Sequence, residues 1–224
     1  MNIVLTSLLP YIIGSALVPI QIIVVILLLT SERRGPLKAI LFVLGMTLAR
    51  LAQGLLFGFV LTGSGSAGAE QSSGGFRALL LVALGIFLLL TAYKQWVNEP
   101  DPDAPPPKWL TMLDDVTPLR AMLFGAGFIL IAAKLWVFTL SAISTIGAAQ
   151  LGRSASTTTY LLYILLAQAL LILPILLRLL LPNQAGGWLR AFGGWLEKNN
   201  RPIVIVVSLV FGLFFFYQGL SKFF

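Results

Sequence analysis

Two basic residues, Arg50 and Lys134, lie inside long apolar stretches where membrane-spanning helices are expected. A charge at the centre of such a helix costs about 2.5–3.5 kcal/mol on insertion scales, so it usually marks a functional site. None of these stretches contains Asp or Glu. The two cations can therefore be satisfied by backbone carbonyls, by helix C-termini or by an anionic ligand. We interpret them as candidate ligands of a negatively charged substrate group; the alternative is that carbonyls and water satisfy both.

Two glutamines accompany the cations. Thr47, Arg50 and Gln53 share one face of a helix by three-residue spacing, and a polar face within lipid is expected to point into a bundle. Gln168 is the counterpart of Gln53 in a later apolar stretch. Each glutamine either bonds to another helix, worth about 0.6–2 kcal/mol, or contacts the substrate.

Pro19 interrupts the first apolar stretch. Because proline removes a backbone hydrogen bond, the helix is expected to break there and to expose polar backbone near the membrane midplane, as in many transporter sites. Gln21 would add hydrogen bonds to that site. Trp136, beside Lys134, either makes a cation–π contact or simply packs. Pro174 predicts another kink.

The composition excludes several classes of function. The chain is 58% hydrophobic and 10% charged, and it contains neither cysteine nor histidine. Disulfides, thiolate metal sites and histidine proton relays are therefore ruled out, and no acid in the apolar stretches could hold a metal. We expect no catalytic residue, metal or cofactor, and hence no enzyme; the loop acids Asp114 and Asp115 more simply cap or solvate a helix. The net charge of +7 is attributed to cytoplasmic loops rather than to nucleic-acid binding.

The apolar segments predict the fold class, an all-α integral membrane protein. A spanning helix needs roughly 20 apolar residues, and six segments qualify: about 3–29, 39–61, 78–97, 121–148, 157–181 and 202–220. The first is too long for a signal-peptide core, so we expect it to be retained. The odd-numbered loops hold ten Lys and Arg residues and the even loops with the C-terminus hold three. By the positive-inside rule, both termini are expected outside.

Two loop segments are predicted to be interfacial helices. One covers 188–199, where aromatic and leucine residues recur at helical spacing: Trp188, Leu189, Phe192, Trp195 and Leu196. The other covers 108–115. Such helices anchor a protein in the headgroup region, or they recognise a headgroup.

The two halves of the chain are related at an offset of 115 residues. The sequence Leu51–Leu56 resembles Leu166–Leu171, and the same offset carries Pro19 onto Lys134. Two related halves of three helices each insert with opposite topology, which is the plan of many secondary transporters. We therefore expect one transmembrane domain over 1–224, with repeats at about 1–97 and 121–224 and a cytoplasmic linker at about 98–120.

At these positions the chain resembles the GAP family, the glycopeptidolipid-addressing proteins of the lysine-exporter (LysE) superfamily. The resemblance is carried by Val18–Ile20, Glu32–Arg34, Pro107–Leu110 and the segment around Lys134. It implies six helices in two inverted repeats (a LysE-like fold) and an export role at the bacterial inner membrane, and GAP proteins are associated with delivery of glycolipids to the cell surface. The superfamily's Asn-Pro-Lys motif survives only as Ala132-Ala133-Lys134, which argues against a strongly broken fourth helix.

The sequence thus predicts an inner-membrane exporter that moves an anionic or amphiphilic solute, lipid-like or amino-acid-like, outward by alternating access. The expected substrate-binding residues are Lys134, Arg50, Pro19, Gln21, Gln53, Gln168 and Trp136. The expected partners are the lipid bilayer and that solute, and no nucleic acid; a homodimer is left open. The alternative function is a non-transporting accessory or scaffold protein of a lipid-export or envelope assembly.

Overall fold

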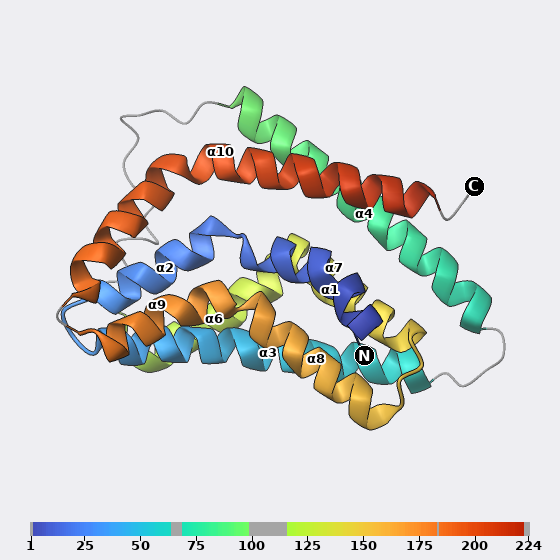
Figure 1. Cartoon of the computed structure of the whole chain (residues 1–224), viewed down its shortest axis with the longest axis horizontal. Helices are drawn as coiled ribbons and strands as arrows, with labels where there is room; N and C mark the ends of the chain where they lie inside the picture. Colours follow the sequence, from blue (N-terminus) through green and yellow to red (C-terminus); the bar gives the residue numbers. More distant parts are fainter. Residues whose placement is uncertain (1, 64–68, 99–115, 183, 222–224) are drawn as a thin grey trace.

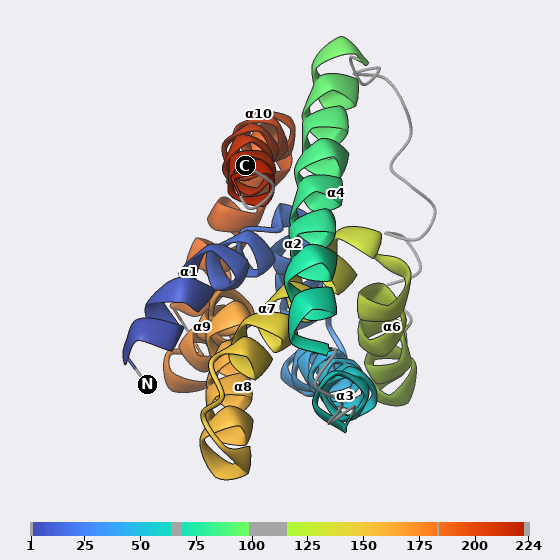
Figure 2. The same cartoon turned by 90° about the vertical axis from the view of Figure 1, so that its right-hand side faces the viewer.

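The computed structural model describes residues 2–63, 69–98, 116–182 and 184–221, and this part of the chain contains helices and no strands. The helices form one elongated bundle (Figure 1). Viewed along the bundle, α2 and α7 lie near its middle (Figure 2). The expected all-helical class is confirmed. The helices are α1 (Asn2–Ala16), α2 (Pro19–Thr30), α3 (Gly35–Gly63), α4 (Ala69–Val97), α6 (Pro118–Ile131), α7 (Ala133–Ala148), α8 (Arg153–Ala167), α9 (Ala169–Leu180) and α10 (Ala185–Leu220).

The first apolar segment is broken where Pro19 predicts it. α1 and α2 meet at a bend of 57°. Val18 is extended, with φ −112° and ψ 95°, as expected for a residue before proline. Pro19 is the first residue of α2, where a missing N–H costs nothing. The proline therefore starts the second half of the segment instead of bending a continuous helix.

The segment around Lys134 is also broken, by 74° between α6 and α7. A strongly broken helix, which the loss of the superfamily's Asn and Pro argued against, is therefore present. At the break, the Ala132 N–H donates to the Phe128 carbonyl and the Ala132 carbonyl accepts from Leu135, so both half-helices are closed by local hydrogen bonds. α7 packs on α1, α3, α4 and α8. This tertiary packing outweighs the helix preference of the two alanines.

The third break lies at Gln168, where α8 and α9 meet at a bend of 63°. Pro174, where a kink was expected, lies within α9. The Gln168 N–H is shared between the carbonyls of Ile164 and Leu165, which tightens the last turn of α8. The kink was therefore predicted about six residues too late.

The apolar helices identify the chain as a membrane protein. Among the described residues, two helical stretches are long and apolar enough to cross a membrane by themselves, Gly35–Gly58 and Ala185–Leu220; counting each bent pair as one span gives up to five. In α4 the apolar part is shorter, Leu81–Val97, because the helix begins with small and polar residues.

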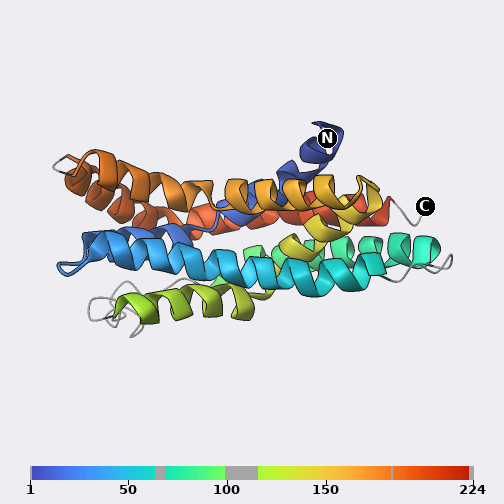
Figure 3. The same ribbon diagram turned by 90° about the horizontal axis from the view of Figure 1, so that it is seen from below.

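The chain connections gather at the two ends of the bundle. Figures 1 and 3 place the start of α1 and the last turns of α10 at the same end of the bundle as the end of α3 and the start of α4. The α2–α3 turn, the start of α6 and the α9–α10 connection lie at the opposite end (Figure 3).

The predicted interfacial helix at 188–199 is the first part of α10, which runs on without a break. Figure 1 shows α10 bending between this part and the remainder. The aromatic and leucine residues that recur at helical spacing are not all on one surface: Leu189 and Leu196 are buried, whereas Trp188, Phe192 and Trp195 are exposed. The second predicted helix, 108–115, and with it Asp114 and Asp115, lie outside the described residues.

Glycines allow two pairs of helices to pack closely. Between α3 and α6, a Cβ added to Gly45 or to Gly125 would lie 1.9 or 2.0 Å from a backbone oxygen of the other helix. Between α4 and α10, a Cβ at Gly85 would lie 2.6 Å from the Phe216 nitrogen. Small residues at such contacts are typical of membrane helices, which associate through close packing.

Candidate functional site

The Arg50 side chain is fully buried midway along α3, with 0% of its surface exposed. Its Nη1 donates to the Tyr163 hydroxyl at 3.3 Å, and its guanidinium carbon lies 5.8 Å from the centre of the Tyr163 ring. Its Nε and Nη2 have no hydrogen-bond partner in the described part of the chain. The guanidinium is thus positioned by a tyrosine, and its charge is not neutralised by any described acid.

Three residues complete what we call the Arg50 cluster: Ser15, Tyr160 and Tyr163. The Ser15 and Tyr163 hydroxyls are 3.2 Å apart, and the Tyr160 hydroxyl donates to the Arg50 carbonyl at 2.6 Å. The two tyrosine rings stack with centroids 5.9 Å apart, because residues three apart share a face of α8. The cluster therefore ties the last turn of α1 to α3 and α8.

Ser15, Tyr160 and Tyr163 are site residues that the sequence did not predict. The available signal was a pair of tyrosines at three-residue spacing in an apolar segment, together with a serine just before the predicted break. What could not be seen is that these segments, more than 100 residues apart, meet at Arg50.

Replacing Tyr160 with phenylalanine is expected to destabilise the bundle modestly. The hydroxyl donates a partly buried hydrogen bond, and an intramolecular hydrogen bond contributes about 0.5–1.5 kcal/mol net. Thermal unfolding of the purified protein in detergent measures the effect. Tyr217→Phe is the matched control because Tyr217 is 76% exposed, and an equal loss in both variants would contradict the role of the Tyr160 bond.

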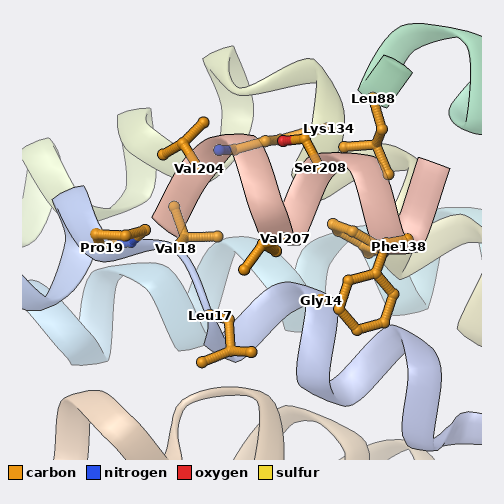
Figure 4. A pocket seen from close by; sticks show the side chains of 11 residues that line it. Gly14, Leu17, Val18, Pro19, Leu88, Lys134, Phe138, Val204, Val207 and Ser208 are labelled. Carbon is orange, nitrogen blue, oxygen red and sulfur yellow. The ribbon is translucent and has the colours of Figure 1, made fainter. Parts of the chain in front are cut away.

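Lys134 lies in the first turn of α7, directly after the α6–α7 break. It lines a small cavity of about 20 Å³ together with Gly14, Leu17, Val18, Pro19, Ser208 and five further apolar residues (Figure 4). That volume holds about one water molecule. No hydrogen bond or ion pair connects Lys134 to another described residue. The cavity thus joins the α1–α2 break, the α6–α7 break and α10 around one ammonium group.

The structure brings Pro19 and Lys134 together but keeps Arg50 apart from them. Ser15 contacts the Arg50 cluster, whereas Gly14, the preceding residue, lines the Lys134 cavity. The end of α1 therefore lies between two cationic sites, and the sequence had placed both cations in one site.

The predicted glutamines are all buried, and each has an unpartnered amide atom within the described residues. The Gln168 side-chain oxygen accepts a hydrogen bond from Thr47 at 2.9 Å, which supports the interhelical alternative for this residue. Both amide atoms of Gln53 lack a partner among the described residues, as does the Gln21 nitrogen. These groups remain available to a polar ligand.

Trp136 supports the helix break rather than the ammonium group. Its indole N–H donates to the Leu130 carbonyl at 2.8 Å, back across the α6–α7 break. Its ring packs edge-on against Phe57, with centroids 5.6 Å apart. Of the two alternatives for this residue, the structure favours packing.

The chain matches the model of the family described as Sap, sulfolipid-1-addressing protein, over residues 8–221. No curated protein and no solved structure matches the chain. The matched family is a related lipid-addressing family, as the resemblance to the glycopeptidolipid-addressing proteins implied. The match does not itself place the chain in the LysE superfamily.

Proposed function

The chain belongs to the sulfolipid-1-addressing protein (Sap) family, and on this basis we propose that it is a transporter that moves an anionic lipid-like solute outward across the bacterial inner membrane. The proposal treats the chain as a carrier and not as an enzyme. The observation that carries it is the meeting of two broken helices at Lys134. Discontinuous helices that face each other near the middle of the bundle form the substrate sites of many transporters.

The Lys134 ammonium is the proposed contact for the negative group of the substrate. Pro19 and Lys134 are each in the first turn of a helix, so the positive ends of α2 and α7 both adjoin the cavity. Gln21 and Gln53 are proposed to bind polar parts of the substrate, and so is the remaining amide nitrogen of Gln168. Because the cavity admits only about one water molecule, α1 or α10 must move away from α7 before a headgroup can enter.

We further propose six spans in two inverted repeats, as in the LysE superfamily. The first repeat would be α1–α2, α3 and α4, and the second α6–α7, α8–α9 and α10. Two observations support this division. The α1–α2 and α6–α7 breaks lie 115 residues apart, the offset found in the sequence. In addition, the second half of each broken span packs on the other two spans of the opposite repeat: α2 contacts α9 and α10, and α7 contacts α3 and α4.

In this arrangement, the end of the bundle with the α2–α3 turn faces the cytoplasm. It carries Arg33 and Arg34 of the α2–α3 turn, Lys38 in the first turn of α3, and the basic residues of early α10. Both termini then lie outside.

The test is lipid movement in liposomes that contain only the purified protein. A fluorescent sulfated glycolipid and its unsulfated counterpart are each followed by quenching of the outer leaflet. The sulfated lipid is expected to exchange between leaflets at least about tenfold faster than in protein-free liposomes, and faster than the unsulfated one. Movement of neither lipid would overturn the proposal and favour the alternative of an accessory protein, for which the exposed Trp188, Phe192 and Trp195 offer a contact surface.

A further inference from the structure

The Nε and Nη2 atoms of Arg50 form the side edge of the guanidinium, the edge that binds an anion through two parallel N–H bonds. Nη1 is already engaged by Tyr163, and the side edge has no partner among the described residues. We propose that this edge binds a small inorganic anion of about the size of chloride, at a site within the bundle that is separate from the Lys134 cavity. The inference goes beyond the proposed function, because the anion would bind whether or not lipid is transported.

Charge balance is the first argument. Arg50 lies 15 residues into α3, which is roughly 22 Å along the helix from Gly35. The acids in the described part of the chain lie far from it in sequence and near helix ends or on the surface: Glu32, Glu70 and Glu197. The Tyr163 ring and the C-terminal end of α1 reduce the cost of burying the charge. They supply no acceptor for Nε and Nη2, however, and a buried charged donor without an acceptor is strongly destabilising.

The fixed orientation of the guanidinium is the second argument. The Tyr163 hydroxyl accepts from Nη1 and lies 3.2 Å from the Ser15 hydroxyl, on the side of the guanidinium away from the Nε–Nη2 edge. That edge therefore presents parallel N–H groups on a fixed framework, which suit an anion and do not suit a cation.

Burial sets the size of the anion. Arg50, Ser15 and Tyr163 are each 0% exposed. Neither the Lys134 cavity nor the cavity between the α2–α3 turn and the start of α6 is lined by Arg50. A lipid headgroup would need a path for its attached chains, whereas a monatomic anion requires only a small fluctuation of the surrounding side chains.

Thermal unfolding of the protein in zwitterionic nanodiscs tests the proposal. Chloride or bromide replaces gluconate, an anion too large for the site, at constant ionic strength. The midpoint of unfolding is expected to rise by several °C and to saturate with halide concentration, since a ligand that binds only the folded state stabilises it. In a bromide-soaked crystal, anomalous scattering is expected beside the Arg50 Nε–Nη2 edge.

Variants separate this site from a general salt effect. Arg50→Gln is expected to lose the halide response. Because that variant could fail to fold, Ser15→Ala is measured as well. It removes the hydroxyl that holds Tyr163 beside Nη1, so it loosens the guanidinium and is expected to raise the halide concentration needed for half of the effect severalfold. Lys134→Gln is the matched control and is expected to respond as the wild type does.

Three results would overturn the proposal: the same unfolding midpoint in halide and gluconate, an undiminished response in Arg50→Gln, or stabilisation by anionic phospholipid nanodiscs without any response to halide. The third would assign the guanidinium edge to a lipid headgroup. No lipid movement is measured, so these results are independent of the transport test.

Discussion

Replacing Gly125 with alanine is expected to disrupt the folded bundle, whereas the same change at Gly127 is expected to be tolerated. A Cβ at Gly125 would lie 2.0 Å from the backbone oxygen of Phe42 in α3, and a Cβ at Gly45 would lie 1.9 Å from the backbone oxygen of Met122 in α6. A backbone carbonyl cannot rotate away as a side chain can, so the two helices must separate. Overpacking usually costs about 1–3 kcal/mol, and we expect a loss at or above the upper end of that range.

Gly127 is the matched control, two residues further along α6. A Cβ there meets nothing within 4 Å. Gly127→Ala is therefore expected to be neutral, or to stabilise the helix by up to about 1 kcal/mol through helix propensity. Denaturant titration in detergent micelles compares the two variants. Equal stability would mean that α3 and α6 are not in backbone contact at this point.

The same glycines show why packing could not be read from the sequence. Gly125 and Gly127 both lie in the apolar segment predicted at 121–148, and nothing in the local sequence tells them apart. Which one meets another backbone depends on the rotation of α6 against α3, two helices about 80 residues apart in the chain. The apolar runs specify that helices form; their mutual rotation is a property of the whole bundle.

The helix breaks likewise differ in whether their cause is local in the sequence or depends on the packing of the bundle. The break before Pro19 was predictable because proline acts locally, through its missing N–H and its effect on the preceding residue. The breaks at Ala132 and Gln168 have no proline, and their positions depend on neighbouring helices. The ends of helices were also hard to predict from the sequence. α4 starts at Ala69, well before the apolar segment predicted at 78–97, because a helix can extend through polar residues beyond the bilayer.

The candidate site was predictable where unusual residues mark it. Two basic residues in apolar surroundings identified Arg50 and Lys134, and the 115-residue offset linked Lys134 to Pro19, which lines the same cavity. The separation of the two cations was not predictable. It depends on the end of α1, where Ser15 contacts Tyr163 while Gly14 lines the Lys134 cavity.

This separation gives Lys134 a specific role that can be tested. Lys134→Met keeps the length and apolar character of the side chain and removes the charge. A hydrogen bond to a charged group contributes about 1.5–3 kcal/mol, which corresponds to a loss of roughly 10- to 100-fold in the rate at which the sulfated glycolipid moves. Movement of the unsulfated lipid is expected to change little, because that lipid has no negative group for the ammonium to bind.

Two controls make the result specific to the charge at the helix break. Lys134→Arg keeps the positive charge and is expected to retain most of the activity. Arg153→Met removes an exposed positive charge at the start of α8 and is expected to have no effect. If folded Lys134→Met protein moved the sulfated lipid at the wild-type rate, the ammonium would not bind the substrate, and the two facing breaks would be a feature of the fold alone. If instead Lys134→Met slowed movement of the sulfated lipid while Lys134→Arg and Arg153→Met did not, the ammonium would be required for binding. The positive ends of α2 and α7 could then not hold the anionic group by themselves.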